Sequence, residues 1–419
     1  MKTLDIVIIG AGAAGLSAAL AAKDQHLSIL IIERNHELGG ILNQCIHNGF
    51  GLHVFQEELT GPEYAERFIH QLYQENIDIM LQTTVIDIKK DDTFLLTLSS
   101  EIHGYQHLKA RSVIIASGCY ERTRGAIQIP GSRPKGIMPA GSAQRYLNID
   151  GYLVGKKVFI LGSGDIGLIM ARRMTLEGAE VLGVAEIMPY SNGLTRNIVQ
   201  CLDDFNIPLY LSHTITNIKG NDVLEGITMM QVDEKLIPIP GTEKHFEVDT
   251  LLLSIGLIPD VSLFDSLTME KSLLTKSAIV DQHLMTSVEG LFVCGNALHV
   301  HDLVDWVSQE GEKAGNFAKQ YVLETYPKEP IYQDVHLGEN IRYCVPQKLD
   351  MNLLDEPITL SCRTTKKMTS GIFKVIQDQQ VIVSKKTKYI APAEMEMIKI
   401  KPEQFISKNP ITLLLEELL

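Results

Sequence analysis

The sequence predicts an α/β fold that contains two βαβ units and ends in a small all-β domain. Three observations predict it. A glycine-rich turn lies between an apolar strand and a helix at residues 5–15, DIVIIGAGAAG. The same arrangement returns at residues 156–167, KKVFILGSGDIG. Beyond residue 327, short β-rich segments among prolines replace the helical patterns.

Composition favours a compact globular protein. The 419 residues are 45% hydrophobic, which is enough for two or three domains. The net charge of −13 comes without a basic patch and argues against binding to nucleic acid or to an anionic membrane. Neither a signal peptide nor a membrane-spanning run is present, so we expect a cytoplasmic protein. Six cysteines without a CxxC pair predict reduced thiols and no metal site.

The first glycine-rich turn has the features of a nucleotide site. Gly10 permits the tight turn, Gly12 lets the backbone approach a pyrophosphate, and Gly15 lets the helix pack closely on the strand. The following strand ends in Glu33, roughly twenty residues beyond the glycines. A carboxylate at this offset accepts hydrogen bonds from ribose hydroxyls. Strand, turn, helix and acid together predict a bound dinucleotide.

The second unit repeats these features from Gly162 to Gly167, and its next strand ends in Glu186. Two such units predict either two nucleotides or one internal duplication. The Glu186 carboxylate would accept a hydrogen bond from a ribose 2′-hydroxyl and would repel a 2′-phosphate. No Arg or Lys that could bind a 2′-phosphate lies between Glu186 and Leu194. NAD is therefore favoured over NADP. Asp165 stands at the helix start, where its charge would disfavour a pyrophosphate, so its side chain should point away.

Two further segments contain candidate functional side chains. RNHELGGILNQCIHNGFG follows Glu33 at the carboxyl edge of the predicted sheet, and Cys45 and His47 lie within it. A buried cysteine and a hydrogen-bonded structural histidine are the alternative readings of these two. The second segment has His299, His301, Asp302, Asp305 and Trp306 before and across the start of a helix near Leu303. That helix start could stabilise negative charge on a bound ring, or it could be a capped helix with two surface histidines.

The remaining secondary structure follows from periodicity. Residues 61–76 read as a helix and residues 79–98 as a strand meander. Residues 331–419 read as the small β domain, and its last segment, ITLLLEELL, is a candidate for a short amphipathic helix.

Taken together, these motifs resemble the two-dinucleotide-binding-domain flavoproteins over about residues 4–325. GAGAAG with Glu33 is similar to the FAD fingerprint of that family, and ASG at 116–118 resembles its ATG segment. TSVEGLFVCGN resembles the closing TxxxGxxAxGD motif, and GSGDIG with Glu186 resembles the NAD site. The resemblance implies an FAD-binding Rossmann-like three-layer domain with an inserted Rossmann-like NAD domain. The expected bounds are 1–122 and 249–326 for the two FAD-binding halves, 123–248 for the NAD domain, and 331–419 for the β domain.

The resemblance also implies which residues form the sites. Leu42 and His47 occupy the offsets of the redox cysteine pair of disulfide reductases, so thiol–disulfide chemistry is not expected. Asn296 replaces the usual Asp at the ribityl chain, and Cys294 replaces a common Ala. The candidate catalytic residues are Cys45, His47, His299 and His301. The expected cofactor-binding residues are Gly10, Gly12, Ala13, Ala14, Gly15, Glu33, Arg34, Gly40, Val85, Ala116, Ser117, Gly118, Gly162, Gly164, Asp165, Ile166, Gly167, Glu186, Gly256, Gly295, Asn296, Asp305 and Trp306.

A narrower resemblance concerns partners. GGILNQCIHNGFG with CGNALHVHDLVDWVSQEGEKAG looks most like FAD/NAD oxidoreductases found with anaerobic glycerol 3-phosphate dehydrogenase-type proteins, a group related to the FAD subunits of hydrogen cyanide synthase and opine oxidase. Such proteins often work beside a second flavoprotein and a small cysteine-rich partner, which implies an oligomer.

Three functions follow as hypotheses. The first is hydride exchange between NAD(H) and bound FAD, with electrons passed to or from a second acceptor or partner flavoprotein. The second is the FAD subunit of a heteromeric dehydrogenase for glycerol 3-phosphate, an amine or an imino acid. The third is a flavin-binding redox sensor or scaffold.

Overall fold

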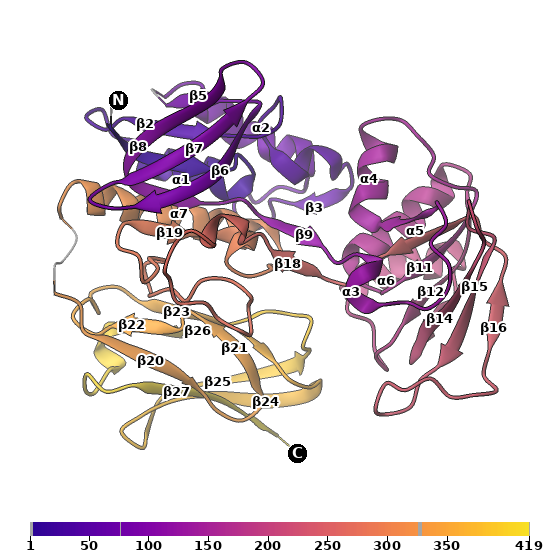
Figure 1. Cartoon of the computed structure of the whole chain (residues 1–419). Coiled ribbons are helices and arrows are strands. Elements are labelled where there is room, and N and C mark those ends of the chain that lie inside the picture. The colour runs from indigo at the N-terminus through magenta and orange to yellow at the C-terminus, as the bar shows by residue number, and fades with distance from the viewer. Residues whose placement is uncertain (1–2, 76, 326–328, 419) are drawn as a thin grey trace. The chain divides into compact units, whose positions relative to one another are not determined.

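The computed structural model describes residues 3–75, 77–325 and 329–418 (Figure 1). The chain forms two compact units. Unit 1 contains residues 1–43, 48–119 and 259–419, and unit 2 contains residues 44–47 and 120–258. No helix in the described part of the chain is both long and apolar enough to cross a membrane.

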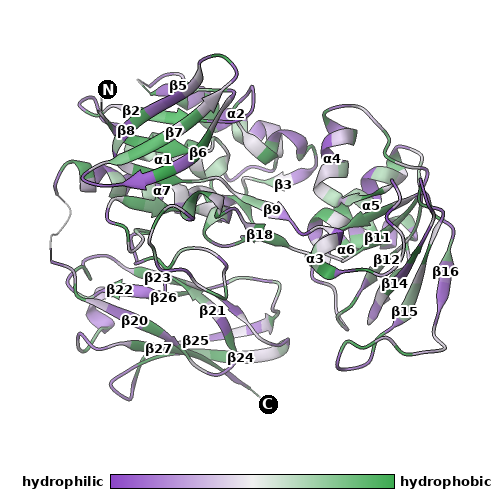
Figure 2. Cartoon of the chain, viewed as in Figure 1, coloured by the Kyte–Doolittle hydropathy of each residue, from purple (hydrophilic) through white to green (hydrophobic). Residues whose placement is uncertain are grey.

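Unit 1 is built on a seven-stranded sheet of order β5-β2-β1-β8-β7-β6, with β19 also paired to β8. The strands β5, β2, β1, β8 and β19 run parallel, and β6, β7 and β8 form an antiparallel meander. Buried apolar side chains dominate the central strands, as the green colour of β7 illustrates (Figure 2). The bounds are β1 Thr3–Ile9, β2 Ile29–Ile32, β5 Asp78–Met80, β6 Thr83–Lys90, β7 Phe94–Ser100, β8 Gly104–Ile115 and β19 Leu291–Val293.

Two helices of unit 1 pack with their backbones in direct contact. These are α1 (Ala13–Ala22) and α7 (Val304–Val322). A Cβ added at Gly311 would lie 2.2 Å from the carbonyl oxygen of Ala14, and one at Gly315 would lie 2.1 Å from that of Ala18. Only glycine permits this approach, which fixes the start of α7 relative to the first glycine-rich turn.

Helix α2 (Gly61–Leu72) begins at a capping box made by Thr60 and Glu63. It ends four residues before the predicted end, and Asn76 lies outside the described residues. The smaller elements of this part of the chain are η1 Gly40–Gln44, β3 Asn48–Phe50, β4 Leu59–Thr60, η3 Ser262–Phe264 and η4 Gly295–Ala297.

Unit 2 has a five-stranded parallel sheet of order β10-β17-β11-β12-β13 and an antiparallel sheet of order β14-β15-β16. Its helices pack on the parallel sheet around the apolar side chains of β11 and β12. The bounds are α3 Arg124–Ile127, β10 Ile137–Pro139, α4 Ala140–Asn148, β11 Lys157–Leu161, α5 Asp165–Leu176, β12 Glu180–Glu186, α6 Thr195–Cys201, η2 Asp203–Phe205, β13 Leu209–Leu211, β14 His213–Lys219, β15 Gly226–Gln231, β16 Lys244–Phe246 and β17 Thr250–Leu253. The short strands β9 Cys119–Glu121 and β18 Leu257–Pro259 pair with each other.

The C-terminal segment is a β domain with its own apolar core (Figure 1). Its sheets have the orders β22-β20-β27-β24-β25 and β21-β23-β26. The bounds are β20 Tyr332–Leu337, β21 Ile341–Val345, β22 Lys348–Asp350, β23 Ile358–Thr364, β24 Met368–Gln377, β25 Gln380–Ile390, β26 Glu396–Ile400, η5 Pro402–Gln404 and β27 Ile411–Glu417.

The helix predicted for ITLLLEELL is wrong, because Ile411–Glu417 forms strand β27. This strand pairs with β20 on one side and β24 on the other. Alternate residues Ile411, Leu413 and Leu415 are buried in the core of the β domain. The apolar residues of this short segment fit the spacing of a helix as well as that of a strand. Pairing with the two neighbouring strands makes the segment a strand.

Two boundaries also differ from the predicted ones. Strand β17 pairs in register with β11 and β10, so the chain returns to unit 1 near residue 259 rather than 249. Residues 44–47 belong to unit 2, where Gln44 Nε2 donates to the carbonyl oxygen of Gly141 at 3.0 Å. A buried strand such as TLLL suits either sheet by composition, so the sequence alone does not assign it.

Candidate functional site

The first glycine-rich turn joins β1 to α1 and leaves one side open. Gly10 has φ +99°, and a Cβ at Gly15 would lie 1.8 Å from the carbonyl oxygen of Gly10. Both positions therefore require glycine for the chain's own packing. Gly12 is the N-cap of α1, and a Cβ there would meet no atom within 4 Å. The open space at Gly12, beside the helix N-terminus, could accept a pyrophosphate.

Glu33 is held beside this turn. Its carboxylate is buried, and one oxygen accepts from the backbone N–H of Ala11 at 2.8 Å while the other accepts from that of Asn35 at 2.9 Å. A carboxylate offers about four lone-pair sites, so lone pairs remain for ribose hydroxyls. The residue that sequence spacing selected is thus fixed at the turn by two backbone donors.

The other predicted residues of this site lie around the same turn, with two exceptions. A Cβ at Gly40 would lie 3.1 Å from Gly12 Cα, and one at Gly295 would lie 2.8 Å from Ala14 Cβ. The carbonyl of Ala116 lies against Gly10, and Ser117 and Gly118 bond to Asp260. Arg34 is exposed after β2, and Val85 is a buried core residue of β6. Ala13 lies with Ala14 in the first turn of α1.

Asn296 is engaged with the histidine segment. Its side-chain oxygen accepts from the backbone N–H of His301 at 3.0 Å and lies 3.3 Å from Nδ1 of the same histidine. The amide nitrogen of Asn296 is therefore the group that could reach a ribityl hydroxyl.

The second turn, between β11 and α5, has the same construction. Gly162 has φ +99°, and a Cβ there would lie 2.0 Å from the carbonyl oxygen of Ser254. The N–H of Gly167 donates to Ser254 Oγ at 3.1 Å. Gly164 is the N-cap of α5, and the nearest atom to its Cβ would be Ser254 Oγ at 3.3 Å. Ser254 was not among the predicted site residues, although it directly follows the apolar run of β17.

Two acids complete the second site. One oxygen of Glu186 accepts from the N–H and the hydroxyl of Ser163 at 3.0 and 2.7 Å, and the other accepts from Met188 N at 3.0 Å. The Asp165 carboxylate accepts from Leu194 N at 2.8 Å and from Asn197 Nδ2 at 2.6 Å. It is thus directed toward α6 rather than the turn, as the sequence predicted. Ile166 follows in α5, and the Gly256 carbonyl accepts from Arg122 N at 3.0 Å.

Cys45 and His47 belong to unit 2. The Cys45 thiol donates to Gln144 Oε1 at 3.8 Å, and burial raises its pKa to about 12. A thiol with this pKa stays protonated at neutral pH and is a poor nucleophile.

Stability of unit 2 should fall as the pH is lowered from about 6.5 to 4. Burial lowers the pKa of His47 from 6.5 to about 4, and the positive charges of Arg196 and Arg172 add to this effect. Between these values the unfolded chain binds a proton that the folded chain does not, so stability rises with pH across this window. The free energy of unfolding of a His47→Gln variant should depend less on pH over the same range. A His47 resonance titrating near pH 6.5 in the folded protein would contradict this.

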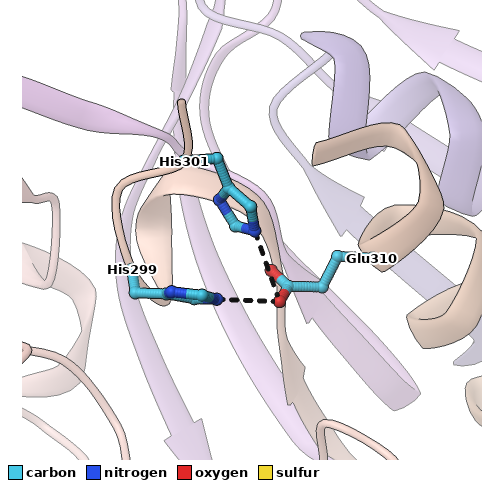
Figure 3. A group of neighbouring side chains, drawn as sticks. All are labelled: His299, His301 and Glu310. Atoms are coloured by element: carbon cyan, nitrogen blue, oxygen red, sulfur yellow. Dashed lines mark hydrogen bonds and ion pairs between the residues drawn. The ribbon is translucent and has the colours of Figure 1, made fainter. Parts of the chain in front are cut away.

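His299, His301 and Glu310 form a buried cluster between the loop after η4 and helix α7 (Figure 3). Glu310 Oε1 lies 3.1 Å from His299 Nε2 and 3.5 Å from His301 Nε2. The other oxygen, Oε2, accepts from the N–H of Gly295 at 2.6 Å. The three side chains are 1%, 3% and 12% exposed, so the predicted alternative of two surface histidines does not apply.

The protonation of each side chain in this cluster depends on the charges of the other two. Burial alone would raise the pKa of Glu310, but His301 and His299 together hold it well below its usual value. Burial lowers the pKa of His299, and His301 adds to the effect. Both histidines were among the predicted catalytic residues, whereas Glu310, which follows them in the pattern H-x-H-x₈-E, was not.

The start of α7 uses Asp305 and Trp306 in packing. The Asp305 carboxylate is buried and accepts from the backbone N–H of Val54 at 3.0 Å. The Trp306 ring stacks on His53 with 4.8 Å between ring centroids, and its backbone N–H donates to the carbonyl of Leu303. These contacts fix the segment at residues 53–54 against the helix start.

The β domain holds the histidine loop through Arg363 of β23. This guanidinium is paired with the Asp302 carboxylate and donates to the carbonyl of Val300 at 3.1 Å and to Tyr343 Oη at 3.1 Å. Asp302 also accepts from the N–H of Met395 at 2.6 Å. No local signal could have identified Arg363, because it lies sixty-one positions after its partner in the sequence.

Two cysteines of the β domain face each other across β21 and β23. Cys344 and Cys362 are register partners, and both are buried. Burial raises the pKa of Cys362 to about 12 and that of Cys344 well above its usual value. Neither thiol therefore supplies a thiolate at neutral pH.

Comparisons with known proteins agree with this architecture. The solved thioredoxin reductase of T. acidophilum superposes with a TM-score of 0.64 at 25% identity, covering 78% of this chain and 100% of that one. The predicted α/β fold with two Rossmann-like domains is thereby confirmed. The NADH dehydrogenase of Bacillus subtilis is 25% identical over 302 residues, 70% of this chain and 54% of its own length.

A third similar protein is the hydrogen cyanide synthase subunit HcnB of Pseudomonas protegens, which is 24% identical over 288 residues, 64% of this chain and 60% of its own length. The chain thus spans about half to three fifths of the length of these two relatives. The model of the pyridine nucleotide-disulphide oxidoreductase family, whose members use FAD and NAD(P)H, matches residues 4–313. This match covers well over half of the chain, and the protein belongs to that family of oxidoreductases.

Proposed function

We propose that the chain binds FAD at the first turn and NAD(H) at the second and exchanges a hydride between them. Electrons then pass to or from a second acceptor or a partner flavoprotein. The observation that supports this most is that two glycine-rich turns lie in separate units, each with a buried carboxylate fixed beside it. Placing FAD at the first turn rests on Gly40, Ala116 and Gly295, which surround it.

The chain's own residues bind and orient. FAD, when bound, supplies the ring that accepts or gives the hydride. The N–H groups at the start of α1 hold the pyrophosphate, and the Glu33 carboxylate accepts hydrogen bonds from the hydroxyls of the adenosine ribose. The start of α7 presents the positive end of a helix dipole near Gly295 and Asn296, where it favours negative charge on a reduced ring.

Proton exchange by the four candidate catalytic residues has less support from the geometry. Both Nε2 atoms of His299 and His301 face Glu310, so either would have to leave the cluster to reach a substrate. Cys45 carries a proton at neutral pH, and His47 is neutral there, because burial shifts both pKa values.

Anaerobic reduction tests the core of the proposal. Purified FAD-loaded protein mixed with NADH in the absence of oxygen should lose the yellow absorption of oxidised flavin. Heat-denatured protein with the same flavin content is the control. Persistence of the yellow band in the native sample would reject hydride transfer.

Replacing Glu186 by Gln should reduce the preference for NADH over NADPH by about tenfold, the equivalent of about 1.4 kcal/mol. The neutral amide can still accept from Ser163 but no longer repels a 2′-phosphate. Ratios of kcat/KM for the two nucleotides measure the effect, and FAD content should not change. An unchanged ratio would contradict a ribose-binding role for Glu186.

A second candidate function is the FAD subunit of a heteromeric dehydrogenase for glycerol 3-phosphate, an amine or an imino acid. HcnB, which is itself a subunit, favours this. Turnover of one of these substrates should then appear only after reconstitution with a second flavoprotein purified from the same cell. A small cysteine-rich protein in the same complex would add support.

A further inference from the structure

We propose that His299, His301 and Glu310 bind a divalent transition-metal ion of the zinc or iron type (Figure 3). The sequence predicted no metal site, because its six cysteines contain no CxxC pair. The proposal is independent of hydride transfer, since it concerns ion binding alone.

The donor set suits such an ion. Two imidazole nitrogens and one carboxylate oxygen lie within 4.8 Å of one another. Two histidines and one glutamate are a known ligand combination for Zn²⁺, and two histidines with one carboxylate also suit Fe²⁺. All three side chains are largely shielded from water, so an ion would compete with little solvent for these ligands.

Hydrogen bonding fixes which nitrogen of His301 is free. Asn296 Oδ1 accepts from the backbone N–H of His301, so this atom is the amide oxygen rather than the nitrogen. The same oxygen lies 3.3 Å from His301 Nδ1, which must therefore carry a proton. In the neutral ring the lone pair of Nε2 then points at Glu310 Oε1, and either a metal ion or a second proton between the two atoms satisfies both.

The distances match those between two ligands of one metal ion as well as those of a hydrogen-bonded pair. An N–H···O hydrogen bond spans about 2.7–3.2 Å. Ligand atoms bound at about 2.0–2.1 Å to a tetrahedral Zn²⁺ are separated by about 3.3 Å. The separations from Oε1 are 3.1 Å to His299 and 3.5 Å to His301, on either side of the value expected for metal ligands.

Neighbouring groups hold two of the ligands in place. The N–H of Gly295 donates to Glu310 Oε2, which leaves Oε1 for the ion, and Asn296 orients His301. Such partners are typical of ligands in metal sites. His299 Nδ1 is buried and makes no hydrogen bond within the described part of the chain. The positive charge of Arg363, which repels a proton or an ion at His299, is balanced by the paired carboxylate of Asp302.

Metal analysis tests the proposal directly. Untagged full-length protein, dialysed into chelator-treated buffer, should retain about one Zn²⁺ or Fe²⁺ per chain by elemental analysis. After removal of that ion with a chelator, Co²⁺ should bind and give d–d absorption in the red, where oxidised flavin does not absorb. His299→Gln and Glu310→Gln should each weaken Co²⁺ binding at least about 100-fold. Glu312→Gln, which alters an exposed acid on the same helix, should bind Co²⁺ as the wild type does.

Two results would overturn the proposal. One is wild-type protein that holds no ion and takes up neither Zn²⁺, Fe²⁺ nor Co²⁺. The other is Glu310→Gln protein that binds as tightly as wild type. If the variants fail to fold, X-ray absorption on Co²⁺-loaded wild type decides, because two imidazole ligands are expected and their absence would reject the site. Failure of NADH to reduce the flavin leaves each of these results unchanged.

Discussion

Gly12→Ala protein should fold normally but lose tightly held FAD. A Cβ at Gly12 meets no protein atom within 4 Å, and the residue has extended backbone with φ −77°. At an N-cap, alanine in place of glycine costs about 1 kcal/mol or less. The added methyl group would, however, occupy the space proposed for the pyrophosphate. Affinity for FAD should therefore fall at least tenfold, while the free energy of unfolding of the apoprotein changes by about 1 kcal/mol or less.

Matched glycine variants separate ligand binding from folding. Gly15→Ala places its Cβ 1.8 Å from a carbonyl oxygen and should destabilise the fold itself by about 1–3 kcal/mol or more. Gly164→Ala, at the corresponding position of the second turn, should raise KM for NADH while flavin content stays at the wild-type level. Flavin retained after gel filtration and denaturant unfolding measure these effects. Wild-type FAD affinity in Gly12→Ala would show that the dinucleotide does not lie over this turn.

The parts of the site that could be predicted are those specified within a short stretch of sequence. In each unit the turn, the helix start and the acid lie within one βαβ unit, so spacing alone selected Glu33 and Glu186. The structure fixes both acids with backbone donors close to their turns. The orientation of Asp165 followed from the expected repulsion between its carboxylate and a pyrophosphate at the same helix start.

The parts that could not be predicted depend on pairing between distant segments. The apolar run Thr250–Leu253 fits either sheet, and only its register with β11 assigns it to unit 2. Ile411–Glu417 is a strand because β20 and β24 flank it. Glu310 becomes significant only where α7 brings it to two histidines of the preceding loop. Such contacts leave no trace in local composition or periodicity.

Arg363→Met should be the most destabilising single change at the histidine loop. The Arg363 and Asp302 side chains are 12% and 17% exposed, and removal of one partner from a buried ion pair costs about 3–5 kcal/mol. The carbonyl of Val300 would lose its donor as well. Denaturant unfolding should show the loss, and amide exchange at residues 299–303 should accelerate, because this loop would no longer be held by the β domain.

Adding Asp302→Asn to Arg363→Met should recover part of this stability, because the uncompensated buried charge is removed. Arg363→Lys should be intermediate, since one ammonium cannot replace the separate donors that reach Asp302, Val300 and Tyr343. Lys366→Met is the matched control in the same domain, because its pair with Glu417 is exposed and should contribute less than about 1 kcal/mol. If Arg363→Met cost no more than Lys366→Met, the β domain would not be what fixes the histidine loop, and the cluster with Glu310 would have to be held by α7 alone.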